Sequence, residues 1–258
     1  MKFILALLSI SILTSTQKAI TGKIKSIDGN GIKYANIGIL EKNTGTVSDV
    51  NGIFNINIPD SLVNDSLTIR HINFQTISLC IRDLSFSKEN EITLDEKENI
   101  LPDIVIHSKK RKYKWISKGI RIPGYAEPNY LGEEFGVVIN VSEFNAISKC
   151  KFNISSCKYD SVIFRFNIYL SEKLEPTYSR NITIYKDNKN KQYEIPLSIP
   201  LEQEKNLFVS LEYAYSYGKG GLKFPIFLGK SLYRKTSLDS FTEVPIRMGF
   251  IIEAIKFE

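Results

Sequence analysis

Histidine is almost absent from this chain: only His71 and His107 occur among its 258 residues. A zinc peptidase of the carboxypeptidase kind needs a His-x-x-Glu pair and a distant third ligand. The residue three positions on is Phe74 after His71 and Lys110 after His107, so neither histidine begins such a pair. We therefore predict no metal site, no cofactor and no peptidase activity.

Cysteine is also scarce, and the chain has three: Cys80, Cys150 and Cys157. Whichever two form a disulfide, the third stays unpaired. Cys80 lies in an apolar segment and is expected to be a small buried hydrophobic residue. If residues 148–154 and 161–170 form a hairpin, Cys157 lies in its turn and Cys150 well down a strand. Cysteines whose Cα atoms are more than about 7 Å apart cannot be joined without backbone movement. A Cys150–Cys157 disulfide stays open at this stage.

Long hydrophobic runs are missing after the first residues. Lys2 precedes an apolar run at residues 3–13, and small residues follow at 14–16. The run is shorter than the ~18 apolar residues that a membrane span requires. This pattern predicts a secretory signal peptide over residues 1–17, with cleavage near Gln17, and an N-terminal anchor is the alternative. We expect the protein to be exported.

Positive charge is in small excess, with a formal net charge of +6. The one dense basic run comprises Lys109, Lys110, Arg111 and Lys112. Nucleic-acid binding would require a basic surface with interleaved aromatic residues, and we predict no nucleic-acid partner. For an exported protein, peripheral contact with an anionic membrane surface is the better functional interpretation, but runs of this length are more commonly solvated loops between domains.

Turn signals are abundant between residues 24 and 58. Asp28-Gly29, Asn30-Gly31, an Asn-Thr-Gly turn at 43–45 and an Asp-Val-Asn-Gly turn at 49–52 separate short apolar segments. Residues 53–58 then alternate between apolar and other side chains, as a half-buried strand does. The region predicts a small β-sandwich without catalytic groups.

The same region carries a family pattern, which is matched by Gly22, Asp28, Gly31, residues 34–37, Gly45, Thr46, Asp49, Gly52 and Phe54. It resembles the carboxypeptidase regulatory-like domain, a transthyretin-like β-sandwich, over residues 20–107. Residues 71–74 depart from the Gly-Tyr pair that the family usually shows there, and residues 101–106 resemble its closing strand. The resemblance implies an accessory module without peptidase activity. Relatives stand at the front of outer-membrane nutrient receptors of Gram-negative bacteria, which implies a periplasmic or outer-membrane location.

A composition shift divides the chain. Basic residues and then several glycines and prolines occupy residues 108–131, which we predict to be a linker between an 18–107 sandwich and a 132–258 domain. In the second domain, residues 135, 137, 139 and 141 share an apolar face, as do 162, 164, 166, 168 and 170. Arg165, Asn167 and Tyr169 point the other way. We predict an all-β chain of two sandwiches, the second one jelly-roll-like.

The second domain also resembles an uncharacterised C-terminal sandwich that follows the regulatory-like module in some exported bacterial proteins. The matching segments are residues 164–169, 208–212, 229–231 and 233–234. This resemblance implies no known activity. Glu212, at the end of the second segment, alternates with apolar residues and is expected to face solvent or cap an edge.

The feature with most functional promise is a row of aromatic residues, Tyr213, Tyr215 and Tyr217, on one face of one strand. Such a row can stack on sugar rings, and Trp115 is a further candidate for ligand contact. The alternative is that the row continues the hydrophobic core, because the apolar residues Leu207, Val209 and Leu211 precede it on the same face of the strand. Paired acids of the glycosidase type also stay open, with these residues available: Glu133, Glu134, Glu143, Asp160, Glu212 and Glu253.

The sequence thus favours a non-catalytic, exported binding or assembly protein of the Gram-negative envelope. We expect its partner to be an envelope protein or a glycan. The alternative is a lectin-like module or a carbohydrate-active enzyme in the C-terminal sandwich.

Overall fold

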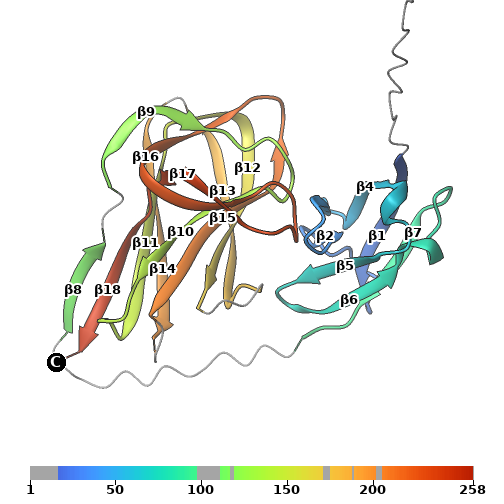
Figure 1. Cartoon of the computed structure of the whole chain (residues 1–258), viewed down its shortest axis with the longest axis horizontal. Coiled ribbons are helices and arrows are strands. Elements are labelled where there is room, and N and C mark those ends of the chain that lie inside the picture. The colour runs from blue at the N-terminus through green and yellow to red at the C-terminus, as the bar shows by residue number, and fades with distance from the viewer. Residues whose placement is uncertain are drawn as a thin grey trace, which may run out of the picture.

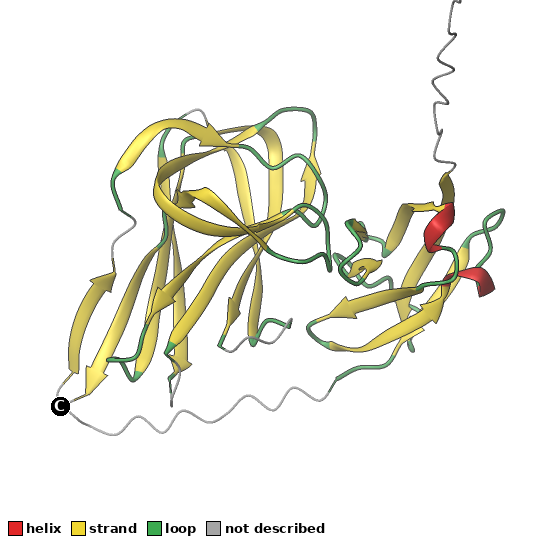
Figure 2. Cartoon of the chain, viewed as in Figure 1, coloured by secondary structure: helices red, strands yellow, loops and turns green. Residues whose placement is uncertain are grey.

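The computed structural model describes residues 17–97, 111–116, 119–170, 175–187, 189–201 and 205–257. The predicted signal peptide up to residue 16, the expected closing strand at 101–106, and Lys109 and Lys110 lie outside these ranges. For Arg111, Lys112 and Trp115 only the backbone is described. Strands make up most of the described chain, and loops connect them (Figures 1 and 2). Its two short helices are single turns, and none of the described helices has the length and apolar content that a membrane crossing requires.

The N-terminal domain is a sandwich of two sheets. One sheet has the order β4 (Ile53–Pro59), β1 (Gln17–Ser26), β7 (Asn90–Leu94), with β1 and β7 parallel. The other has the order β3 (Thr44–Val47), β2 (Asn36–Ile39), β5 (Ser66–His71), β6 (Phe74–Cys80). Two 3₁₀ turns, η1 (Asp60–Leu62) and η2 (Ile81–Asp83), complete it.

The turns that the sequence predicts in this domain have a visible physical basis. The carboxylate of Asp49 accepts hydrogen bonds from the backbone N–H groups of Asn51 and Ile53, each at 2.8 Å. Gly52 adopts a φ of +81°, and a Cβ there would lie 2.2 Å from the carbonyl oxygen of Ile24. Alternate residues of β4, with Phe54 among them, then enter the core. The predicted sandwich is confirmed.

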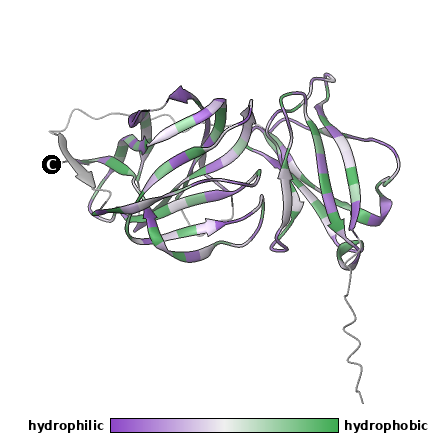
Figure 3. Ribbon diagram, turned by 90° about the horizontal axis from the view of Figure 1, so that it is seen from above, coloured by the Kyte–Doolittle hydropathy of each residue, from purple (hydrophilic) through white to green (hydrophobic). Residues whose placement is uncertain are grey.

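The C-terminal domain is a second, larger sandwich. Its larger sheet has the order β13 (Tyr178–Asp187), β12 (Ser156–Tyr169), β15 (Asn206–Tyr217), β10 (Glu134–Asn140), β16 (Leu222–Arg234), β17 (Thr242–Met248), and β9 (Arg121–Ala126) also pairs with β16. The smaller sheet has the order β14 (Lys191–Pro200), β11 (Ala146–Ile154), β18 (Ile251–Phe257), β8 (Arg111–Ile116). Apolar and polar residues alternate along many of these strands (Figure 3).

The faces predicted for this domain are confirmed. The predicted apolar residues of β10 and β12, such as Val137 and Phe166, pack in one core between the sheets. The predicted linker is corrected, because β8 and β9 lie within residues 108–131 and pair with β18 and β16. Edge strands tolerate the charge and proline content that suggested a linker, since one side of an edge strand stays unpaired.

All three cysteines are free thiols. Cys150 is buried on β11 opposite Ile195 of β14, and Cys157 is buried on β12 opposite Asp187 of β13. The two residues belong to different sheets of the sandwich, so the disulfide that the sequence left open does not form in this structure.

Candidate functional site: a buried polar cluster between the two sandwiches

A group of polar and charged side chains is buried where the larger sheet of the C-terminal domain meets the N-terminal domain. We call it the polar cluster; its members are Asn36, Glu134, Arg165, Asn167, Tyr169, Ser210, Glu212, Arg234 and Ser237. Each is at most 8% exposed. The sheet register explains why they meet, because Glu212 lies opposite both Glu134 and Arg165 on neighbouring strands, and Glu134 lies opposite Arg234.

Arg165 forms the part of the cluster that reaches the N-terminal domain. Its guanidinium donates to the Oε2 atom of Glu212 at 2.8 Å and to the Oδ1 atom of Asn36 at 2.6 Å. It also donates to the backbone carbonyl oxygen of Tyr34. One side chain of the second sandwich therefore satisfies two acceptors of the first sandwich and one acid of its own sheet.

Glu134 is the centre of the other part. Its Oε1 atom accepts hydrogen bonds from the amide of Asn167 at 3.1 Å, from the hydroxyl of Tyr169 at 3.0 Å, and from the hydroxyl of Ser210. Its Oε2 atom forms an ion pair with Arg234. The amide of Asn167 also donates to Oε2 of Glu212 at 3.2 Å, which connects the two parts.

The cluster balances two carboxylates with two guanidinium groups. Burial alone would lower the pKa of Arg234, but the neighbouring Glu134, Tyr169 and Glu212 raise it above its ordinary value. Burial, followed by the charge of Glu134, raises the pKa of Tyr169 well above its ordinary value, so Tyr169 stays a neutral donor. Buried charges of this kind are tolerated only when they are paired and hydrogen-bonded. The geometry is that of a structural ion network.

The loop between β16 and β17, residues 235–241, extends the contact between the domains. Ser237 donates from its hydroxyl to Asn36 Oδ1 and to Glu212 Oε1, each at 3.3 Å. The backbone N–H of Glu41 donates to the carbonyl oxygen of Leu238 at 3.1 Å, and the N–H of Asn43 donates to the Asp239 carboxylate at 3.0 Å. The loop thus contributes Ser237 to the polar cluster and adds two further hydrogen bonds between the domains.

Glycine allows this loop to approach so closely. A Cβ on Gly45 would lie 2.3 Å from the carbonyl oxygen of Ser237, and one on Gly38 would lie 2.7 Å from the same atom. Gly38 and Gly45 are opposite each other on β2 and β3. Together they form a flat patch of the N-terminal domain against which residue 237 packs.

The predicted tyrosine row is divided in the structure. Tyr213 lies opposite Phe164, Tyr215 lies opposite Ile163, and Ala214 is the extra residue of a β-bulge. A bulge shifts the alternation by one residue, so the residues after it change face. Tyr213 is buried in the core of the second sandwich, as the core alternative predicted, whereas Tyr215 packs toward the N-terminal domain.

The other two tyrosines form an aromatic group at the domain boundary. The ring centroid of Tyr215 lies 6.3 Å from that of Tyr34 and 5.1 Å from that of Tyr217. Burial and a hydrogen bond with Tyr217 raise the pKa of Tyr34 above its ordinary value. Tyr217 is 39% exposed and is the most exposed member of this group, since Tyr215 is half-buried and Tyr34 is buried. The backbone of Trp115 belongs to β8 in the smaller sheet, whereas Tyr215 and Tyr217 lie on β15 of the larger sheet.

The expectation that Glu212 faces solvent is wrong, since its side chain is fully buried beside Arg165. Sequence reasoning recognised that Arg165, Asn167 and Tyr169 share the face opposite the core but assigned no role to that face. A signal was available, because Ser210 and Glu212 follow the same alternation on a second strand. Opposite charges on the outward faces of two adjacent strands can indicate a covered polar face.

The comparisons with known proteins match a family model to the N-terminal domain. Residues 20–106 match the family model of the CarboxypepD_reg-like domain. No curated protein matches the chain. Among solved structures, the chain is similar to infectious bursal disease virus Gx strain, with 6% identity, a TM-score of 0.34, and coverage of 93% of this chain and 56% of that chain. It is also similar to the T13 particle of the same virus, with 12% identity, a TM-score of 0.32, and coverage of 98% and 61%.

A third similar structure is BcpA, the major pilin subunit of Bacillus cereus, with 10% identity, a TM-score of 0.20, and coverage of 93% of this chain and 69% of that chain. The chain spans little more than half the length of the viral proteins it matches. The family match agrees with the turn pattern and with the two sheets of the N-terminal sandwich. The chain therefore carries a CarboxypepD_reg-like domain at residues 20–106, followed by a second β-sandwich.

Proposed function

We propose that this protein is a non-catalytic binding or assembly component of the Gram-negative envelope, exported by its N-terminal signal peptide. In this proposal a protein or glycan partner contacts a surface to which both sandwiches contribute. The observation that carries it is the position of Arg165, whose guanidinium holds Asn36 and Tyr34 of the first sandwich while it is paired with Glu212 of the second. Two domains joined in this way present one pre-organised surface, and pre-organisation reduces the entropic cost of binding.

The acids of the polar cluster support the non-catalytic reading. A glycosidase needs one protonated acid and one carboxylate that both reach the sugar. Glu134 and Glu212 are fully buried, each is paired with an arginine, and each accepts hydrogen bonds from neighbouring side chains. Both carboxylates are thus shielded from solvent and engaged by neighbouring side chains, so neither is placed to reach a bound sugar. Their geometry suits the joining of two domains.

The test compares two glycine variants of the full chain. Gly45→Ala places a Cβ against Ser237 and should separate the sandwiches without altering either core. Gly221→Ala is the matched control, because its Cβ would meet Glu127 at an ordinary 3.6 Å. Tagged wild-type and variant proteins would be expressed in a Gram-negative host, cross-linked in the cell, and analysed by mass spectrometry after fractionation of the envelope.

We expect the wild-type protein and Gly221→Ala to be found in the periplasmic or outer-membrane fraction, cleaved near Gln17, and cross-linked to the same partner. Gly45→Ala should lose that partner. Retention of the partner by Gly45→Ala would show that a single sandwich suffices for binding. Hydrolysis of any member of a panel of glycosides by the wild-type protein would contradict the non-catalytic assignment.

The exposure of Tyr217 favours a second candidate function, glycan binding at the domain boundary. Aromatic faces stack on sugar rings, and Tyr217 lies beside Tyr215 at the edge of the contact. A glycan array would compare the wild-type protein with Tyr217→Ala. Tyr185→Ala is the control, since Tyr185 is more exposed, at 65%, and lies on β13. Saturable binding that only Tyr217→Ala abolishes would assign the partner class as glycan.

A further inference from the structure

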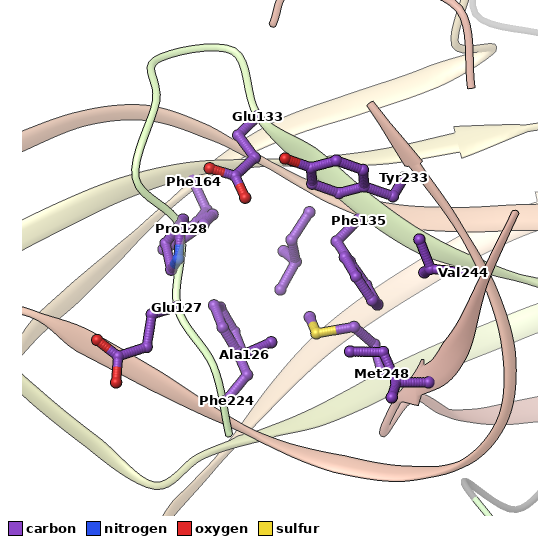
Figure 4. Close-up of a pocket in the computed structure, with 12 residues that line it drawn as sticks. Ala126, Glu127, Pro128, Glu133, Phe135, Phe164, Phe224, Tyr233, Val244 and Met248 are labelled. Atoms are coloured by element: carbon purple, nitrogen blue, oxygen red, sulfur yellow. The ribbon is translucent and has the colours of Figure 1, made fainter. Parts of the chain in front are cut away.

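The second sandwich contains a cavity of about 250 Å³ beside the loop that leads from β9 to β10 (Figure 4). Its inner wall consists of core residues, Phe164, Leu211, Phe224 and Met248, each no more than 4% exposed. The side walls are Phe135, Val244, Ile246 and Ala126. A molecule in this cavity would therefore contact the hydrophobic core itself.

The cavity lies directly behind the polar cluster, on the other face of the same strands. Phe164, Leu211 and Tyr233 line the cavity, and the residues that follow them, Arg165, Glu212 and Arg234, belong to the cluster. This arrangement follows from strand alternation. The strands that form the cavity wall are held in register by the ion pairs on their opposite face. A site on such rigid elements is more precise than one on loops.

One acid at the cavity, Glu133, is held by hydrogen bonds and forms no ion pair with a described lysine or arginine. The Oε2 atom of Glu133 accepts hydrogen bonds from the backbone N–H groups of Asn129, at 2.6 Å, and of Tyr130, at 3.1 Å. Its carboxylate is also hydrogen-bonded to the side chain of Tyr233, whose pKa is raised to about 12 by burial and by Glu133. Within the described residues, no lysine or arginine forms an ion pair with Glu133. The other acid of the cavity, Glu127, is paired with Lys223 at 3.3 Å.

We propose that this cavity binds a small molecule that has an apolar, ring-sized body and a primary ammonium group. The body would fill the space between Phe135, Phe224 and Met248, and the ammonium group would contact the carboxylate of Glu133, which Figure 4 shows beside the hydroxyl of Tyr233. A dry apolar cavity of ~150 Å³ is large enough for benzene, so the present volume accommodates an aryl ring with a short alkyl chain. The site lies behind the domain contact and goes beyond the function proposed above.

The depth of the cavity favours a small molecule over a macromolecule. The inner-wall residues Phe164, Leu211 and Met248 are almost inaccessible from outside. A protein surface contacts residues that are already exposed, whereas a small ligand enters a pre-formed apolar pocket with a few polar groups at its rim. The charge of Glu133 then selects a cation among molecules of the right size.

The experiment measures by calorimetry how three probes bind to the full chain, each with a phenyl ring on a two-carbon chain that ends in a polar group. The probes are 2-phenylethylamine, 2-phenylethanol and 3-phenylpropanoate, which are cationic, neutral and anionic at neutral pH. We expect the amine to bind about tenfold more tightly than the alcohol, and the acid to bind least, because a hydrogen bond to a charged group contributes more than a neutral one.

Variants locate the probes. Glu133→Gln should lower the affinity for the amine to that for the alcohol and leave the affinity for the alcohol unchanged. Glu127→Gln is the control acid, and we expect it to change the affinity for the amine less than threefold because Lys223 already pairs with it. Val244→Phe should fill the cavity and abolish binding of every probe. If Val244→Phe fails to fold, Ala126→Leu serves the same purpose.

Equal binding of the three probes, or an amine affinity that Glu133→Gln leaves unchanged, would overturn the assignment of the ammonium group to Glu133. Absence of binding at millimolar concentrations would overturn the proposal as a whole. Binding of a peptide with adjacent phenylalanine and lysine, when the free amine does not bind, would assign the cavity to a partner's side chain and also overturn it.

Discussion

Replacement of Arg165 tests whether the polar cluster joins the two sandwiches. Arg165→Met keeps a long apolar stem but removes the ion pair with Glu212 and the hydrogen bonds to Asn36 and Tyr34. Glu212 would stay fully buried, with its other guanidinium neighbour, Arg234, 3.8 Å away. Removal of one partner from a buried ion pair costs about 3–5 kcal/mol, chiefly because the other charge stays buried. We expect a loss of that size in the free energy of unfolding.

Equilibrium unfolding in urea would measure this loss with two signals. The only tryptophan of the chain, Trp115, belongs to β8, so its fluorescence reports on the second sandwich. Far-ultraviolet circular dichroism reports on both sandwiches. The two signals should follow a single transition in the wild-type protein, and we expect them to separate in Arg165→Met because the sandwiches then unfold independently.

The matched control is Arg180→Met, since Arg180 is an exposed arginine on the edge strand β13. It should change the free energy of unfolding by no more than about 0.5 kcal/mol. The double variant Arg165→Met/Glu212→Met should lose about 1–3 kcal/mol less than the sum of its two single variants, because it leaves no unpaired acid. A loss in Arg165→Met as small as that of Arg180→Met, or strict additivity in the double variant, would refute the reasoning.

Three further predictions concern titration, packing and thiol chemistry. Burial, and then the charge of Arg165, lower the pKa of His71 to about 4. As the pH falls, the unfolded chain therefore takes up a proton before the folded chain does, and each pH unit between about 6.5 and 4 should lower the free energy of unfolding by up to ~1.4 kcal/mol. Urea titrations at several pH values would measure this dependence, and His71→Asn should remove it. Phe166→Ala should cost about 3–5 kcal/mol by opening a cavity at a fully buried position, and an unchanged melting temperature would contradict the assigned face. Cys150 and Cys157 should react with a thiol reagent only after unfolding, because burial raises the pKa of both; a mass two units lower under non-reducing conditions would instead reveal a disulfide.

The tyrosines show where reasoning from the sequence stopped. Alternation alone placed Tyr213, Tyr215 and Tyr217 on one face, and the alternative that the row continues the core was correct only for Tyr213. The bulge at Ala214 moved the other two to the opposite face. Bulges depend on the pairing between neighbouring strands, so the sequence of a single strand does not reveal them.

The predicted linker shows a related limit. Residues 111–116 and 121–126 are basic or rich in glycine and proline, and these features are typical of loops. Each segment nevertheless pairs with a strand that is about 100 or more positions away in the chain, β8 with β18 and β9 with β16. A strand whose only partner is so distant has little local signature, because its hydrogen bonds are made after the rest of the sheet exists.

The sequence by itself determined the all-β class, the two sandwiches, the turns of the first domain and the apolar faces of β10 and β12. These properties are local, since strand alternation and turn preference depend on residues within a few positions of each other. Only the tertiary structure decided the use of the polar faces. It brought Arg165 to Asn36, paired both acids with arginines, buried Glu212 and opened a cavity behind them. The physical reason is that the charge pairing and the burial of a residue depend on which strands and which domain cover it, and those partners lie far away in the chain.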